Sequence, residues 1–209
     1  MVANIVLAIV IGYLLGSIPF AYIAARLIKG VDIRKVGGGN MGALNVLREV
    51  GTTVGFTVLF LDMAKGALAV LVAQWLGLHL YWVFAVGFVV VAGHNWPVWL
   101  KFKGGQGLAT TLGVLFALAP VPFSISFAII VIGMLITSNA RLASGVGLAF
   151  LPLFIWLFDG ELPLIIYSIV FPLFCVLKAM TRLKSDLAST DTKRSLIIDR
   201  EYKPWQRKR

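Results

Sequence analysis

The sequence predicts an all-α integral membrane protein with about seven transmembrane helices, some of them short. Three observations support this prediction. Of the 209 residues, 59% are hydrophobic and only 13% are charged, and the mean hydropathy is +0.92, values far from those of a soluble domain. The apolar residues fall into long runs along the chain, and nearly all Lys and Arg residues lie between alternate pairs of runs.

Seven apolar runs follow one another, at residues 2–25, 53–76, 80–100, 108–119, 121–137, 146–158 and 162–179. Basic residues follow the first run and do not precede it, so we expect a retained helix and no cleaved signal. Ser17 and Pro19 are expected to kink that helix. The runs at 108–119 and 146–158 would make only ~18–20 Å of helix, less than a ~30 Å hydrocarbon core. Five full spans therefore stay open as an alternative to seven.

The basic residues predict which side of the membrane each loop faces. Seven spans place residues 26–51, 101–107, 138–145 and the chain after 179 on one side. Of the 19 Lys and Arg residues, all but Lys65 and Lys178 fall in these segments, which makes that side cytoplasmic and puts the N-terminus outside and the C-terminus in the cytoplasm. Five spans predict the same sidedness. We expect residues 1–180 to form the helical bundle and residues 181–209 a basic, polar cytoplasmic tail.

Composition also excludes several classes of function. The formal net charge is +10, but membrane proteins collect basic residues on the cytoplasmic side, so no nucleic-acid partner is expected. The single cysteine, Cys175, lies inside an apolar run and leaves no disulfide framework. We expect neither a metal site nor a cofactor.

The first unusual loop is "GGGNMGALNVLR", residues 37–48. Glycines let the backbone present several N–H groups to one anion. A short helix is expected to open at the glycines, and Asn45 and Arg48, three residues apart, would share one face of it and reach one polar ligand. The alternative is that the glycines only make turns and that the basic residues only set the topology.

The second unusual loop is "GHNWPVWLKFKGGQGLATT", residues 93–111. Lys101 and Lys103 supply positive charge, and the paired glycines then lead into a helix whose N-terminus adds the positive end of its dipole. A phosphate is therefore the expected ligand. The spacing is not that of an ATP-binding P-loop. His94 is interpreted as a packing residue at a helix end and not as a base.

The third cytoplasmic loop, "TSNARLASG", contributes Arg141 and Ser144. Three cationic loops on one side of an apolar bundle predict a substrate with a phosphate at its water end and a lipid chain at the other. Asp62 and Lys65, three apart inside a span, are expected to form an ion pair that locks helices together.

These loops resemble two motifs of the bacterial acyl-phosphate:glycerol-3-phosphate acyltransferases. Residues 37–48 resemble G-S-G-N-x-G-A-T-N-V-x-R, and "GHNWPVWLKFKGGQGLAT" resembles G-H-x-x-P-V-F-x-x-F-K-G-G-K-G-V-A-T. "YLLGSIPFAYIAARL" and "FLDMAKG" are similar to the first and second spans of that family. The resemblance therefore covers nearly the whole membrane core in order.

The resemblance implies a multi-pass enzyme of the bacterial inner membrane with its active site facing the cytoplasm. Such an enzyme transfers a fatty acyl group from acyl phosphate to the sn-1 hydroxyl of glycerol 3-phosphate, without a cofactor, and gives lysophosphatidic acid and phosphate for phospholipid synthesis. On this basis we predict the catalytic residues Asn45, Arg48, Lys103 and Arg141. The predicted substrate-binding residues are Gly37, Gly38, Gly39, Asn40, Lys101, Gly104, Gly105, Gly107, Thr110, Ser144 and Arg182.

The chain departs from the family pattern at several positions. The serine and threonine of the first motif are Gly38 and Leu44, and the lysine after the paired glycines is Gln106. Near the C-terminus, "VLKAMTRL" keeps the Arg-Leu ending of the family motif but has Val176 and Ala179 where the family has histidine and asparagine. Two alternatives stay open: a non-catalytic or re-purposed paralogue that binds a phosphorylated lipid, and a small transporter of anions or organophosphates.

Overall fold

The computed structural model describes residues 1–137 and 139–187, and in these residues the chain is helical with no strand. The α-helices are α1 (Val2–Ser17), α2 (Phe20–Lys29), α3 (Ala43–Glu49), α4 (Thr52–Trp75), α5 (Leu80–Asn95), α6 (Leu108–Leu118), α7 (Pro120–Thr137), α8 (Ala140–Phe158) and α9 (Leu162–Leu187). Two short 3₁₀ helices, η1 (Ile33–Lys35) and η2 (Val98–Leu100), lie in the loops. The chain forms two compact units, Met1–Leu118 and a second that begins at Ala119.

Each of the seven predicted apolar runs is mostly helical. Four segments are long and apolar enough to cross a bilayer: Val2–Lys29, Thr52–Trp75, Leu80–Leu100 and Pro120–Thr137. Shorter apolar helices cover Leu108–Leu118, Leu142–Phe158 and Leu162–Leu177. The all-α membrane fold is confirmed, while the number of crossings and their direction stay predictions. Helix α8 begins well before the apolar run at 146–158 and α9 continues past residue 180, because a helix extends through polar residues that a hydropathy run excludes.

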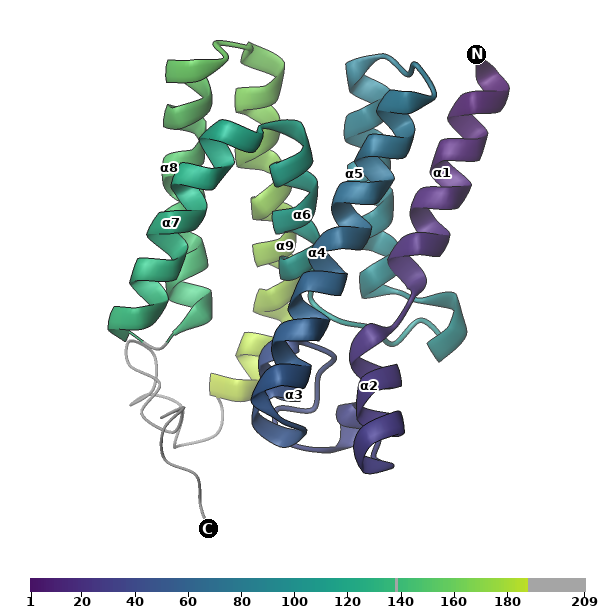
Figure 1. The fold of residues 1–209 in the computed structure, drawn as a ribbon, viewed down its shortest axis with the longest axis vertical. Helices are drawn as coiled ribbons and strands as arrows, with labels where there is room; N and C mark the ends of the chain where they lie inside the picture. Colours follow the sequence, from purple (N-terminus) through teal and green to yellow (C-terminus); the bar gives the residue numbers. More distant parts are fainter. Residues whose placement is uncertain (138, 188–209) are drawn as a thin grey trace. The chain divides into compact units, whose positions relative to one another are not determined.

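Helix α4 is the centre of the first unit, where it contacts α1, α2, α3, α5 and α6 (Figure 1). Small residues bring these helices close together. Gly66 of α4 lies directly against the backbone of Thr110 in α6, and Gly113 of α6 against that of Met63. Gly16 meets the backbone of Val90 in the same way where α1 crosses α5. In a membrane the hydrophobic effect does not drive helices together, and such close contact between backbones allows them to associate.

The first span is broken near its middle, which confirms the expected kink (Figure 1). Helix α1 ends at Ser17, Ile18 adopts an extended conformation with ψ 115°, and α2 starts after Pro19. Proline has no N–H to donate, and it forces the residue before it out of the helical region. The result is two separate helices, and the carbonyl of Ile18 is left at the break.

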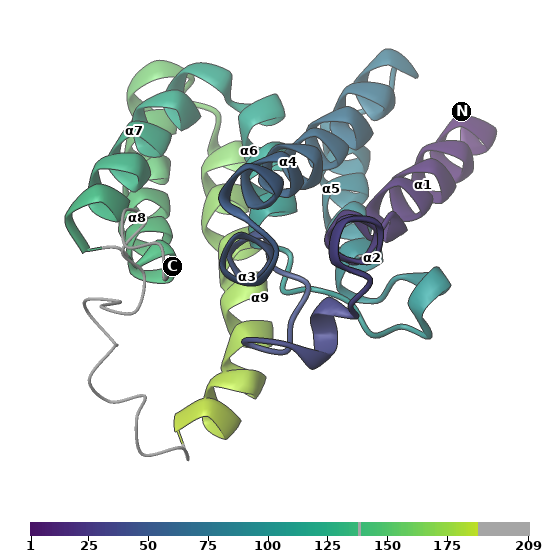
Figure 2. The same cartoon turned by 60° about the horizontal axis from the view of Figure 1, so that its bottom comes forward.

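Helices α2 and α3 and the connecting loops lie at one end of the first unit, which Figure 2 brings forward. A small apolar core holds this end together, formed by Ala21, Ala25, Ile33, Met41, Val46, Val50 and Val58. Leu100 of η2 packs against the same core. Segments far apart in the sequence, the first at residues 30–50 and the second at 96–107, are therefore tied to one packed cluster.

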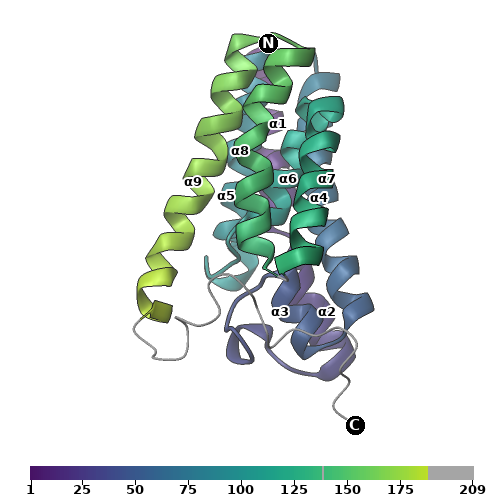
Figure 3. The same cartoon turned by 90° about the vertical axis from the view of Figure 1, so that its left-hand side faces the viewer.

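The second unit contains α7, α8 and α9, and α8 contacts both of the others (Figure 3). Its core includes Leu151, Ile155 and Phe171, which are fully buried. Tyr167 and Phe171 of α9 stack with ring centroids 4.7 Å apart. Ser144 is buried in α8.

Candidate active site

The first glycine loop, residues 37–42, is held by the side chain of Asn45. The Asn45 amide nitrogen donates to the carbonyls of Ile33 (3.1 Å), Val36 (3.2 Å) and Asn40 (2.9 Å). Its oxygen accepts from the backbone N–H of Gly38 at 2.9 Å. Gly37 and Gly39 have φ values of 54° and 61°, which only glycine adopts without strain. Asn45 is buried, and both ends of its amide are used by the backbone of residues 33–40.

Two further side chains shape the same segment. Asn40 bridges the loop, since its amide nitrogen donates to the carbonyl of Gly38 and its oxygen accepts from the N–H of Gly42. Asp32 caps η1 and pairs with Arg34, whose Nη2 lies 2.8 Å from Asp32 Oδ2. Hydrogen bonds from Arg34 lower the pKa of Asp32 to about 2 and raise the pKa of Arg34. Side-chain hydrogen bonds therefore fix this loop.

The second glycine loop, residues 101–107, is packed directly on the end of α5. The N–H of Gly104 donates to the carbonyl of Asn95 at 3.2 Å, and that of Gly105 donates to the carbonyl of His94 at 3.1 Å. A Cβ on Gly104 would overlap the carbonyl oxygen of His94, and a Cβ on Gly105 would overlap its ring nitrogen Nε2. Close packing of backbone on backbone therefore fixes this loop, and no residue larger than glycine fits at positions 104 and 105.

The second glycine loop combines positively charged side chains with the N-terminus of a helix. Lys101 and Lys103 are exposed, and Gly107, with φ 81°, leads straight into α6. Thr110 in the first turn of α6 is fully buried, and its hydroxyl has no hydrogen-bond partner among the described residues. A loop with two lysines before a helix N-terminus is chemically suited to a phosphate.

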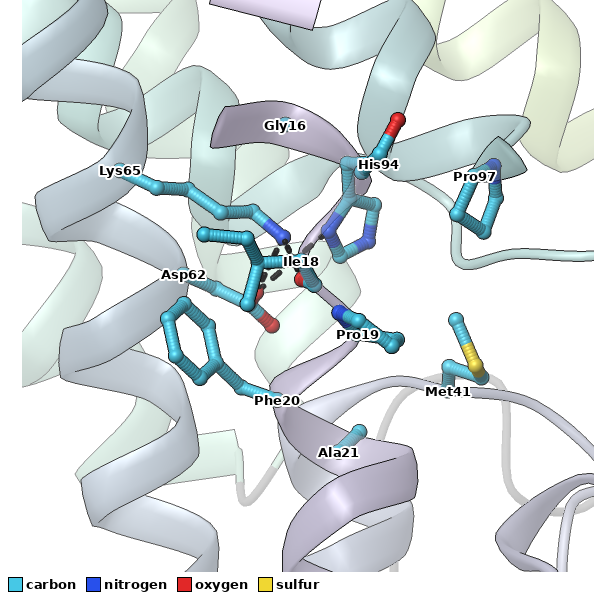
Figure 4. Close-up of a pocket in the computed structure, with 11 residues that line it drawn as sticks. Gly16, Ile18, Pro19, Phe20, Ala21, Met41, Asp62, Lys65, His94 and Pro97 are labelled. Atoms are coloured by element: carbon cyan, nitrogen blue, oxygen red, sulfur yellow. Dashed lines mark hydrogen bonds and ion pairs between the residues drawn. The ribbon is translucent and has the colours of Figure 1, made fainter. Parts of the chain in front are cut away.

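One buried cluster of ionisable side chains could be predicted only in part from the sequence. Lys65 Nζ lies 2.7 Å from Asp62 Oδ1, which confirms the expected pair, and His94 Nδ1 lies 3.5 Å from the same oxygen (Figure 4). The i,i+3 spacing indicated the pair, but nothing in the sequence placed His94 beside it. These side chains line a narrow pocket together with Met41 of the first glycine loop and Pro97, which precedes the second. The pocket has no room for a water-sized molecule.

The predicted site residues are divided between the two units. The first unit contains most of them: the predicted glycines, Asn40, Asn45, Arg48, Lys101, Lys103 and Thr110. Helix α3 begins at Ala43, after the glycines, and it turns Asn45 inward while Arg48 is exposed. A ligand shared by these two residues stays a prediction. Ser144 is buried in the second unit. The side chains of Arg141 and Arg182 lie outside the described residues. Among the described residues, no group of three or more His, Cys, Asp or Glu could hold a metal ion.

Comparison with known proteins gives a consistent match over the whole membrane core. The family described as glycerol-3-phosphate acyltransferase matches residues 6–188. Glycerol-3-phosphate acyltransferase 1 of Dehalococcoides mccartyi is 41% identical over 204 residues, covering 95% of this chain and 98% of that protein. The glycerol-3-phosphate acyltransferase of Desulforamulus reducens is 39% identical and covers 90% and 94% of the two chains.

Solved structures agree with the sequence matches. The crystal structure of PlsY (YgiH), an integral membrane glycerol 3-phosphate acyltransferase, in its glycerol 3-phosphate form superposes with a TM-score of 0.78 at 34% identity, covering 88% of this chain and 92% of that one. The lysophosphatidic acid form of PlsY gives a TM-score of 0.76. Sequence, fold and the two glycine loops thus lead to one conclusion: the chain belongs to the glycerol-3-phosphate acyltransferase family.

Proposed function

We propose that this protein transfers a fatty acyl group from acyl phosphate to the sn-1 hydroxyl of glycerol 3-phosphate in the bacterial inner membrane. The products are lysophosphatidic acid and inorganic phosphate, and the site faces the cytoplasm. One observation above all supports the proposal: the two glycine loops are tied to one end of a membrane-spanning unit, with exposed cations at Lys101 and Lys103 in the second loop and at Arg48 in α3, which follows the first. That end is chemically suited to phosphate groups, and the apolar helices beside it are suited to an acyl chain.

The reaction needs alignment and charge neutralisation more than a protein nucleophile. Acyl phosphate is a mixed anhydride, and its phosphate is a good leaving group. The glycerol oxygen attacks the acyl carbon, the bond from that carbon to the phosphate oxygen breaks, and the departing phosphate takes the hydroxyl proton. The enzyme must hold two phosphates close together despite their repulsion, which requires preorganised cations and N–H donors.

Residue roles follow from this requirement. Lys101, Lys103 and Arg48 are exposed on the first unit, and we assign them to neutralising the phosphates. The start of α6 supplies backbone N–H groups, whereas the N–H groups of Gly104 and Gly105 donate to the carbonyls of Asn95 and His94 and hold the loop in place. Arg141, Ser144 and Arg182 stay predicted contributors from the second unit.

Asn45 receives a different role from the catalytic one that the sequence predicts. Its amide donates to the carbonyls of Ile33, Val36 and Asn40 and accepts from the N–H of Gly38. We therefore assign it to positioning: Asn45 fixes Gly38 and its neighbours, and these residues meet the ligand.

The test is acyl transfer by the purified protein with palmitoyl phosphate and labelled glycerol 3-phosphate. We expect lysophosphatidic acid as product, and a loss of about 100-fold in kcat/KM for Lys103→Ala and for Arg48→Ala, because each removes a charge from the phosphates. Lys35→Ala is the matched control, since Lys35 is an exposed cation of the same end and should retain full activity.

A folded protein that makes no product with acyl phosphate would contradict the proposal. Product that forms equally well in both alanine variants would contradict the residue roles only. If the chain is inactive, the double substitution Val176→His and Ala179→Asn distinguishes a decayed enzyme, which regains acyl transfer, from a paralogue that only binds a phosphorylated lipid.

A further inference from the structure

A buried cluster of ionisable side chains joins the break in the first span to the second glycine loop. Figure 4 shows Lys65 and Asp62 of α4 and His94 of α5 pointing toward the break at Ile18 and Pro19. The side chains of Asp62 and Lys65 are each 3% exposed, and that of His94 is 6% exposed. It costs free energy to bury charges this deeply in a membrane-spanning segment, so we infer that these side chains have a function other than packing.

Lys65 fixes one end of the cluster to the backbone. Its Nζ donates to the carbonyl of Ile18 at 2.9 Å, an oxygen at the helix break that also accepts from the N–H of Phe20 at 3.2 Å. Two donors therefore satisfy this carbonyl in a segment where water cannot. The same Nζ lies 5.5 Å from the centre of the Phe20 ring, on the other side of the break. Lys65 is therefore held at a fixed point between α1 and α2.

Asp62 links that fixed point to α5. Its Oδ1 lies 2.7 Å from Lys65 Nζ and 3.5 Å from His94 Nδ1. A carboxylate beside Nδ1 fixes which ring nitrogen carries the proton and how the ring is turned. Nδ1 faces Asp62 and Nε2 is on the opposite side of the ring, so we expect Nδ1 to carry the proton.

His94 is the surface on which the second glycine loop rests. Gly105 lies directly against Nε2, and Gly104 lies against the His94 carbonyl, with no space for a Cβ on either glycine. The N–H of Gly105 also donates to that carbonyl. Because Gly105 is in direct contact with the His94 ring, a rotation of the imidazole would displace Gly105.

We propose that Asp62 is a positioning residue for the second glycine loop: anchored through Lys65 to the helix break, its carboxylate holds the His94 ring in the orientation on which Gly104 and Gly105 pack. This inference rests on the proposed function only for the identity of the ligand, a phosphate group bound by the loop. None of these side chains needs to touch the substrate.

The sharpest test removes both charges together. Asp62→Leu with Lys65→Met leaves no uncompensated charge in the membrane, and replacing a buried ion pair with apolar residues of similar volume is often tolerated. If the pair only locks helices, this double variant keeps the wild-type KM for glycerol 3-phosphate. If Asp62 positions the loop, we expect KM to rise about 10-fold, because a small displacement of a binding loop is costly. KM does not depend on the fraction of enzyme that is folded, so loss of stability alone would not change it.

A mutant cycle tests whether Asp62 acts through His94. Asp62→Asn and His94→Asn are each expected to raise KM, and the double variant should show no more than the larger single effect. Additive effects would contradict the proposal. Ser17→Ala is the matched control: Ser17 is buried in the wall of the same pocket and makes no side-chain hydrogen bond among the described residues, so KM should stay unchanged.

A spectroscopic measurement needs no substrate. The chain has two histidines, so ¹⁵N-histidine NMR of a His79→Gln variant reports on His94 alone. We expect a proton on Nδ1 and none on Nε2, and loss of this fixed tautomer in the Asp62→Leu, Lys65→Met variant. A spectrum with Nδ1 unprotonated would overturn the proposal whatever the activity.

These readouts separate the two proposals. A wild-type protein that makes product, with an unchanged KM in the double variant, would overturn the positioning role and leave the acyltransferase standing. A wild-type protein that makes no product but shows the predicted tautomer, and that binds glycerol 3-phosphate in calorimetry more tightly than the double variant does, would overturn the acyltransferase and support the positioning role.

Discussion

The two glycine loops use similar residues but are built in different ways. The first is held by side chains: Asn45 binds its carbonyls, Asn40 bridges it, and its glycines provide turns. The second is held by packing: Gly104 and Gly105 lie against α5 with no space for a side chain. Hydrogen-bonded loops tolerate added atoms on their outer face, whereas packed loops do not. The same residue type, glycine, therefore has a different importance in each.

The largest expected effect comes from a methyl group in the packed loop. Gly104→Ala would push a Cβ into the His94 carbonyl oxygen, which cannot move without displacing α5. We expect kcat/KM for acyl transfer to fall by about 100-fold, since a shift of ~1 Å in a positioned group has effects of that size.

The comparison variant is Gly38→Ala in the first glycine loop. Gly38 is exposed, and the nearest atom to its added Cβ would be the end of the Asn40 side chain at 3.1 Å, which can move slightly. Gly38 is itself a predicted substrate-binding residue, so we expect some loss of kcat/KM, but a clearly smaller one than for Gly104→Ala. Equal losses at the two glycines would remove the distinction between the loops.

Asn45→Asp should have the next largest effect, on stability. The carboxylate could still accept from Gly38, but it would face the carbonyls of Ile33, Val36 and Asn40 without a hydrogen to donate. Leaving these buried acceptors unpaired should lower the free energy of unfolding by ~3 kcal/mol. This corresponds to a fall of roughly 6–12 °C in Tm for a chain of this size. Thermal unfolding in detergent measures it, and an unchanged Tm would show that side chains do not hold the first loop.

The smallest effect concerns Asp32 and depends on pH. The pKa of Asp32 is lowered from 3.8 to about 2 by hydrogen bonds from Arg34, so its charged form stabilises the folded state. This contribution is complete above pH 3.8 and is lost as pH falls toward 2. We expect Asp32→Asn to lower stability by ~1 kcal/mol at pH 7, and this difference to vanish near pH 2. A difference that is the same at both pH values would rule out the charge as its cause.

The sequence predicts the fold well because the strongest signals are local. Long apolar runs specify helices, and Pro19 specifies the break in the first span. The i,i+3 spacing of Asp62 and Lys65 also predicted their ion pair correctly. Each of these depends on residues a few positions apart.

The site was harder to predict because its contacts join distant segments. The spacing of Asn45 and Arg48 suggested a shared ligand, yet residues three apart on a helix differ by ~60° in direction. That angle is enough for one to be buried and the other exposed. Asn45 binds Ile33, 12 positions away, and His94 meets residues of α4 and of the second glycine loop. No periodicity indicates such contacts, and they follow only from the way the helices pack.

The ion pair within α4 has a consequence for how the membrane protein is made. Asp62 and Lys65 are the two charged residues of this helix, and they lie within one turn of each other. Each charge alone at the centre of a span opposes insertion by ~2.5–3.5 kcal/mol. Because the partners are neighbours on one helix, the segment carries no net charge as it inserts, and it does not depend on His94 of α5 for this neutralisation.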